Sequence, residues 1–179
     1  MKCPACKTSY LEDRQLEAQL PVLACGNCSG MWINGQTYLH WVEAAPVEVS
    51  AVEAVETQAS ADRKPGKFCP ECGHYMRQAK VGHGIGFALD RCGACGGFWL
   101  DLREWQALKR AGLHGDLHRV FSDAWQGQLA REERTAREEH LLEEKLGATD
   151  YAEIRRVKKW IEKHPHRAEL QAYLLAVRG

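Results

Sequence analysis

The strongest constraint on the fold is a set of eight cysteines that form four Cys-x-x-Cys pairs and repeat along the chain. The second group of four reproduces the first after a displacement of 66 or 67 residues, and 18 or 19 residues separate the two pairs of each group. The flanking sequence repeats as well: CPAC matches CPEC, and CGNCSGMWIN matches CGACGGFWLD. A chain of 179 residues with this repeat is expected to fold into small, similar units.

A Cys-x-x-Cys pair is typical either of a redox dithiol or of half a metal site. A thioredoxin-type dithiol needs a pair at the start of a helix within a βαβ pattern, and no such pattern surrounds either copy. Two matched sets instead fit the spacing of four-cysteine zinc sites, so we expect two Zn²⁺ ions, although iron also suits four sulfurs. The expected ligands are Cys3, Cys6, Cys25 and Cys28 in site 1 and Cys69, Cys72, Cys92 and Cys95 in site 2.

The stretch between the two pairs of each copy is expected to form a β-hairpin that brings the pairs together. The hairpins are predicted over residues 10–25 and 75–92, and the glycine-rich GHGIG marks the turn of the second. Lys7 stands where the second copy has a glycine. Glycine is expected wherever the backbone turns tightly toward sulfur, at Gly26, Gly73 and Gly93.

A short helix is predicted after each hairpin, over residues 35–44 and 102–111. Asn34 and Asp101 are the expected N-caps, and Glu104 can complete a capping box with Asp101. Two tryptophans precede these caps and are expected in the core: Trp32 and Trp99.

These motifs resemble the transcription-factor-IIB-type zinc-ribbon family, with CPxC, a hairpin, and C-x-x-C-x-G-x-W-[LI]-[DN] leading into a helix. The resemblance covers about residues 1–44 and 67–112 and is closer in the second copy, because the first departs at Lys7, Ser29 and Thr37. It implies a small zinc-stabilised α+β fold with two ribbons and zinc binding by all eight cysteines. It brings no catalytic residues, and the family name does not establish a role in transcription.

The segment between the copies has the composition of a flexible linker. Residues 46–66 lack leucine, isoleucine and aromatic residues, which favours an extended tether between zinc ribbon 1 (residues 1–45) and zinc ribbon 2 (residues 67–113). Flexibly linked ribbons follow from this interpretation. Alternatively, Val47 and Val49 alternate as in a strand and could pair with a sheet edge.

Residues 114–179 lack cysteine and are predicted to form an α-helical C-terminal region. A long helix is expected over about 115–146, followed by a helical hairpin that Thr149 or Asp150 caps and that Pro165 breaks. The apolar stripes of this region are narrow, so they need cover from the same chain or from another copy, and a homo-oligomer through the tail is one expectation. The first stripe comprises Leu117, Val120, Phe121, Ala124, Trp125 and Leu129.

The charges balance at 24 lysines and arginines against 24 acidic residues, so no overall basic field indicates nucleic acid. Residues 63–113 are locally basic, with nine lysines and arginines against four acidic residues, whereas residues 114–179 have a net charge of zero. Basic side chains alternating with aromatic ones favour contact with phosphates and bases, although a solvated surface has the same composition. The candidates for nucleic-acid binding are Arg63, Lys64, Lys67, Arg77, Lys80 and Arg91.

The sequence has no signal-type segment and no apolar run near the ~20 residues that span a bilayer, so a cytoplasmic protein without membrane contact is expected. No set of residues assembles a nucleophile, a base and an oxyanion donor, and no small-molecule substrate is indicated. The favoured function is a non-enzymatic zinc-binding adaptor or regulator that binds protein or nucleic acid. The alternative is a redox- or zinc-responsive switch that releases metal when its thiolates are oxidised.

Overall fold

The computed structural model describes residues 1–17, 19–44 and 65–176. Residues 1–127 form one compact unit and residues 128–179 a second. The predicted linker and its two alternating valines lie outside the described residues, apart from Pro65 and Gly66.

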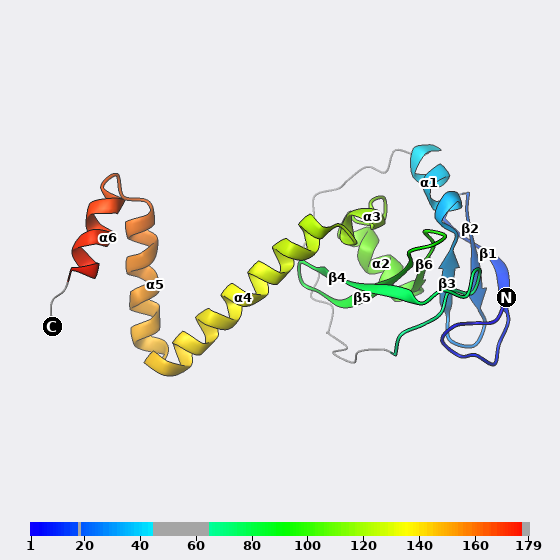
Figure 1. The fold of residues 1–179 in the computed structure, drawn as a ribbon, viewed down its shortest axis with the longest axis horizontal. Helices are drawn as coiled ribbons and strands as arrows, with labels where there is room; N and C mark the ends of the chain where they lie inside the picture. Colours follow the sequence, from blue (N-terminus) through cyan, green and yellow to red (C-terminus); the bar gives the residue numbers. More distant parts are fainter. Residues whose placement is uncertain (18, 45–64, 177–179) are drawn as a thin grey trace. The chain divides into compact units, whose positions relative to one another are not determined.

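The first unit is built on an antiparallel sheet to which both cysteine repeats contribute (Figure 1). The predicted hairpins are confirmed, and each repeat adds a third strand that the sequence analysis missed. The strand order is β1-β2-β3-β6-β5-β4. The strands are β1 (Leu11–Glu17), β2 (Leu20–Cys25) and β3 (Gly30–Ile33) in the first repeat, and β4 (Met76–Gly82), β5 (Ile85–Cys92) and β6 (Phe98–Asp101) in the second.

The two ribbons join where β3 pairs with β6. Trp32 lies opposite Trp99, and Gly30 lies opposite Asp101. Because Trp99 is the counterpart of Trp32 in the repeat, the two ribbons are related by an approximate twofold axis through this pair. The expectation of flexibly linked ribbons is therefore wrong for the folded parts: they share one continuous sheet.

Each ribbon is followed by the short helix that the sequence predicts. Helix α1 spans Gly35–Ala44, and the Asn34 side chain accepts hydrogen bonds from the amides of Gln36 and Thr37 at 3.0 and 3.1 Å. Helix α2 spans Leu102–Arg110 and begins with a complete capping box between Asp101 and Glu104, with hydrogen bonds of 2.8 and 2.9 Å. The predicted caps are thus confirmed.

Residues 114–126 belong to the first unit and pack against its ribbons. The Tyr38 hydroxyl of α1 donates to the carbonyl of His114 and accepts from the amide of Leu117, both at 2.9 Å. The side chains of Trp125 and Gln126 donate to the carbonyls of Val81 and Lys80 in β4, at 3.0 and 2.8 Å. These bonds use carbonyls of an edge strand, which reduces its capacity to pair with another chain.

The predicted long helix is interrupted near its start. A short helix, α3 (Leu117–Val120), ends before Phe121, and α4 runs over Asp123–Leu146. The Ser122 hydroxyl accepts a hydrogen bond from the Trp125 amide at 3.2 Å, so it caps α4 and starts a new helix. The break allows Val120, Phe121 and Trp125 all to be buried.

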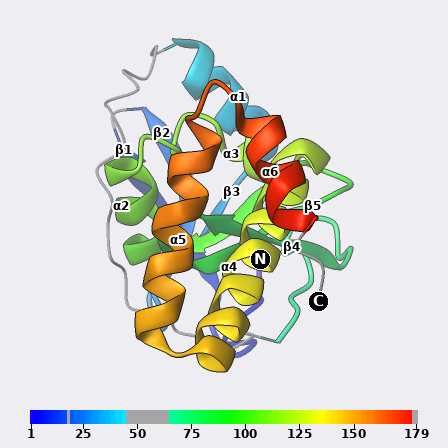
Figure 2. The ribbon, with the colours of Figure 1, turned by 90° about the vertical axis from the view of Figure 1, so that its left-hand side faces the viewer.

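The second unit consists of the rest of α4, α5 (Ala148–Glu162) and α6 (Arg167–Leu175). Gly147 has a left-handed backbone with φ of 81° and separates α4 from α5. The predicted caps Thr149 and Asp150 instead lie inside α5. The break before α6 is confirmed, and the two helices contact each other (Figure 2).

The residue after the second cysteine of a pair takes the left-handed conformation in all four knuckles. Lys7 and Ser29 have φ of 63° and 57° in the first ribbon, and Gly73 and Gly96 have φ of 75° and 74° at the matching positions. Gly26 and Gly93, which stand between two cysteines, do not have positive φ, so the expectation that their turns demand glycine is wrong. The strain therefore falls on two non-glycine residues of the first ribbon.

Replacing Gly73 with alanine is expected to lower the free energy of unfolding of the zinc-loaded protein by about 1 kcal/mol, because a Cβ disfavours this conformation. The reverse change, Lys7→Gly, is expected to raise it by about 0.5 kcal/mol, since glycine removes strain but adds unfolded-state entropy. Denaturant unfolding measures both. Gly93→Ala is the matched control, because that position has the same open space as Gly73 but no left-handed backbone. An equal loss at Gly93 and Gly73 would contradict the assignment of the effect to backbone conformation.

Candidate metal centres

The eight cysteines converge into two separate groups of four, with the sulfur atoms of each group within 4.8 Å of one another. Site 1 contains Cys3, Cys6, Cys25 and Cys28, and site 2 contains Cys69, Cys72, Cys92 and Cys95. In each group, one Cys-x-x-Cys knuckle precedes the hairpin and the other follows its second strand. The hairpin therefore brings the two knuckles together, as the spacing predicts.

The distances between sulfur atoms fit a four-coordinate metal. Cys3 and Cys28 are 3.6 Å apart and Cys6 and Cys25 are 3.8 Å apart. The matching pairs in site 2, Cys69 with Cys95 and Cys72 with Cys92, are 3.6 and 3.4 Å apart. Four sulfurs at the usual zinc distance of ~2.3 Å in a tetrahedron have edges of about 3.8 Å. All eight cysteines are free thiols, so both groups are positioned to hold metal ions.

Backbone amides in the knuckles stabilise thiolates. Burial raises the pKa of Cys25, but hydrogen bonds from the amides of Cys28 and Asn27, together with neighbouring thiols, outweigh this effect and lower the pKa to about 7. Cys92 occupies the same position in site 2, and the amides of Cys95 and Ala94 likewise overcome burial and lower its pKa to about 7. Because thiolates are the form that binds metal, each site has one cysteine prepared for coordination near neutral pH.

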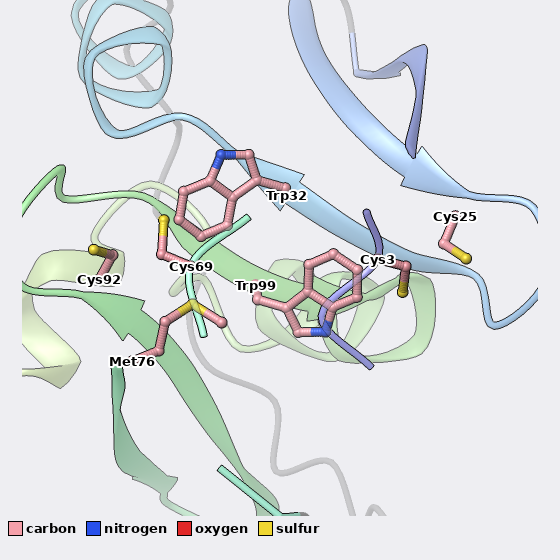
Figure 3. Packing of buried hydrophobic residues seen from close by; sticks show 7 residues of the cluster. All are labelled: Cys3, Cys25, Trp32, Cys69, Met76, Cys92 and Trp99. Carbon is pink, nitrogen blue, oxygen red and sulfur yellow. The ribbon is translucent and has the colours of Figure 1, made fainter. Parts of the chain in front are cut away.

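Each metal site is covered by a tryptophan from the opposite ribbon (Figure 3). A Cβ on Gly97 would lie 2.2 Å from the Trp32 ring, and a Cβ on Gly30 would lie 2.2 Å from the Trp99 ring. The two glycines stand two residues after the last cysteine of each site. Trp32 and Trp99 are 1% and 5% exposed, which confirms their predicted core position, but the surface that they cover belongs to the other ribbon.

Glu71 links the two ribbons and was not singled out by the sequence analysis. It lies inside the first knuckle of site 2, where its carboxylate accepts a hydrogen bond from Trp32 Nε1 at 3.2 Å and from Asn34 Nδ2 at 3.0 Å. Asn34 therefore both caps α1 and binds the opposite knuckle. The first ribbon has Ala5 at the equivalent position, so the repeat gives no signal for this contact.

Polar side chains also contact single sulfur atoms at the surface. Asn27 Nδ2 donates to Cys6 Sγ at 3.3 Å, and His74 Nδ1 lies 3.4 Å from Cys72 Sγ. Hydrogen bonds to sulfur stabilise the negative charge of a thiolate that coordinates a metal.

The predicted nucleic-acid residues do not form a single exposed patch among the described residues. Lys67 is buried, and its Nζ lies 2.7 Å from Asp90 Oδ2, so this residue cannot reach a phosphate. The Arg91 guanidinium lies over the rings of Phe98 and Phe121, 5.8 Å from each centroid. Of the remaining candidates, Arg77 donates to the carbonyl of Phe121 at 3.3 Å and is exposed, Lys80 is exposed, and Arg63 and Lys64 lie outside the described residues.

Replacing Lys67 with methionine is expected to lower the free energy of unfolding by about 3 kcal/mol, because Asp90 would remain buried without its cation. Gln78 keeps one hydrogen bond to Asp90 at 2.9 Å, which favours the lower part of the range for broken buried pairs. Lys80→Met is the matched control on the exposed side of β4, with an expected change below about 0.5 kcal/mol. Chemical denaturation compares the two, and similar losses would contradict a structural role for Lys67.

Comparison with known proteins agrees with this geometry. A family model described as transcription factor zinc-finger, of the TFIIB zinc-ribbon type, matches residues 2–44 and 68–111. Neither curated proteins nor solved structures gave a significant match. Within the described ranges, no helix has the length and apolar character needed to cross a membrane. The chain therefore carries two tandem zinc ribbons of the TFIIB-type family, each with four cysteines positioned to hold a metal ion.

Proposed function

We propose that this chain is a non-enzymatic zinc-binding adaptor or regulatory protein, in which the paired ribbons form a structural module and the helical tail binds a protein or nucleic acid. The observation that carries the proposal is the closed ligand set of both sites. Four cysteines fill the coordination shell of zinc, which leaves no open position for a substrate or a reactive water. Zinc in such sites stabilises a fold and does not activate a reactant.

The tail supports the second half of the proposal, because many of its large apolar side chains are exposed within residues 128–176. Tyr173 and Leu175 are 77% and 88% exposed. Exposed large apolar side chains in such number are typical of surfaces that a partner covers. The further exposed members are Leu141, Leu142, Ile154, Trp160 and Leu174.

To test this proposal, the intact zinc-loaded chain is purified under native conditions, and any macromolecule that copurifies with it in fixed stoichiometry is identified. The substitution Ile154→Gln with Leu174→Gln is expected to abolish that complex while zinc content and helix content stay unchanged. Leu39→Gln with Leu102→Gln is the matched control, because these leucines are 44% and 45% exposed on the ribbon helices. The control is expected to retain the partner.

Two results would overturn the proposal. The first is a chain that binds no macromolecule at low salt and releases zinc reversibly with mild peroxide, which would favour the redox switch. The second is a complex that survives in the tail variant and is lost in the ribbon control.

A further inference from the structure

Charge is unevenly distributed along the helical tail, although its sum is zero. Residues 155–167 contain six lysines and arginines against one glutamate, a net charge of +5, whereas α4 contains four against seven acidic residues. All six cations are exposed: Arg155, Arg156, Lys158, Lys159, Lys163 and Arg167. The second unit therefore presents one strongly basic segment to solvent, over α5 and the turn that follows it.

Part of this segment lines a pocket of about 380 Å³ between the end of α4 and α5. Arg155 and Lys159 are four residues apart, so they lie on the same helix face one turn from each other. Ala148 and Ala152 share this face, and their small side chains leave the space between the cations open. The pocket therefore combines positive charge with room for a ligand group.

The acidic side chains near the pocket neutralise only part of its positive charge, so the remaining cations can bind a ligand. Arg156 is engaged by Glu153, with 2.6 Å between Nη2 and Oε1, and Glu143 of α4 contributes one carboxylate to the lining. No described residue forms an ion pair with Arg155 or Lys159. An anionic ligand is the class that this arrangement attracts.

An exposed aromatic ring on the same helix distinguishes between anionic partners. Trp160 is 54% exposed, directly follows Lys159, and contacts the ring of His164 with 5.1 Å between centroids. Cations that track a phosphate backbone beside a ring on which bases stack are the combination used for single strands. Base stacking on the indole therefore favours a single-stranded nucleic acid over a partner that offers only carboxylates.

From these observations, and building on the proposed macromolecule-binding function, we infer that α5 and residues 163–167 form a binding site for single-stranded nucleic acid. The cations on one face of α5 bind phosphates, and Trp160 stacks on a base. This location differs from the basic set predicted on the second ribbon.

Fluorescence anisotropy with a labelled mixed-sequence single-stranded RNA, measured on the full-length zinc-loaded chain at several salt concentrations, tests this site. The variant R155Q/K159Q/K163Q is expected to bind at least tenfold more weakly at low salt. It should also reduce the slope of log K against log[salt] by about 2, since each lost phosphate contact contributes ~0.7. R131Q/R134Q/R137Q is the matched control, because it removes three exposed arginines from α4; its affinity should stay within about twofold of the unmodified chain.

The stacking role has its own readout. Trp160→Ala is expected to weaken binding roughly tenfold without changing the salt slope, and Trp160→Phe is expected to retain most of the affinity. Circular dichroism and zinc content check that every variant is folded.

Three results would overturn the inference. Binding lost only in Arg77→Gln with Lys80→Gln would place the site on the second ribbon. Equal competition by polyglutamate would indicate a general acidic partner. Absence of RNA binding at low salt would also refute the site, whereas a tail-dependent protein complex in the native purification would still support the proposed function.

Discussion

Replacing Cys92 with serine is expected to reduce the bound zinc from two ions to one, to unfold the second ribbon and to disturb the tryptophan packing of the first. Apparent zinc-binding free energies of about 10–16 kcal/mol in small zinc peptides exceed the net stability of most domains, so a ribbon is not expected to survive without its metal. Because Trp99 of the second ribbon packs beside site 1 and β6 pairs with β3, loss of the second ribbon removes the cover of site 1 and a neighbouring strand of the first ribbon. Near-ultraviolet circular dichroism and mass spectrometry measure tryptophan packing and zinc content.

Gly93→Ser is the control for this prediction. It introduces serine one residue away, in the same knuckle, where a Cβ meets nothing within 4 Å. Two zinc ions and unchanged stability are expected. A Cys92→Ser protein in which the first ribbon keeps its native tryptophan signals would show that the ribbons fold independently.

The second large effect is expected at Trp99. Its replacement by alanine should lower the free energy of unfolding by about 4 kcal/mol, because a buried indole is lost beside site 1. In the unmodified chain, Gly30→Ala should cost about 2 kcal/mol through the clash of its Cβ with the Trp99 ring. Once Trp99 is alanine, adding Gly30→Ala should cost less than about 0.5 kcal/mol. Denaturant unfolding of the four zinc-loaded proteins gives the coupling energy.

Gly26→Ala provides the matched glycine control, because its position has open space and no left-handed backbone. A change below about 0.5 kcal/mol is expected there in both backgrounds. Additive losses at Gly30 and Trp99 would mean that the glycine is required for a reason other than the opposing tryptophan.

The local parts of the fold could be predicted because their signals lie close together in sequence. The cysteine spacing identified both ligand sets, and Asn34, Asp101 and Glu104 marked the starts of the two short helices within a few residues. The pairing of β3 with β6 could not be predicted in this way. Each strand has four residues, too few for an alternating pattern, and pairing depends on contacts across 65 or more residues.

The charged residues show the same limit. Lys67 belongs to a basic stretch of sequence, but its partner Asp90 lies 23 residues away and turns it into a buried structural residue. The basic segment on α5 was not predicted, because the acidic residues of α4 cancel its charge when the net charge is summed over residues 114–179. The break between α3 and α4 was not predicted either. A serine in an apolar helical pattern is compatible with a continuous helix, and Ser122 acts as an N-cap only because the chain bends at this point.

Native mass spectrometry of the intact, unmodified chain tests the central claim most directly, since it counts metal ions and detects disulfides in one spectrum. The structure predicts two zinc ions for each chain, eight reduced cysteines, and a shift to the higher charge states of an unfolded chain when a chelator removes the metal. A folded chain without metal, or a Cys92–Cys95 disulfide in the native protein, would contradict it.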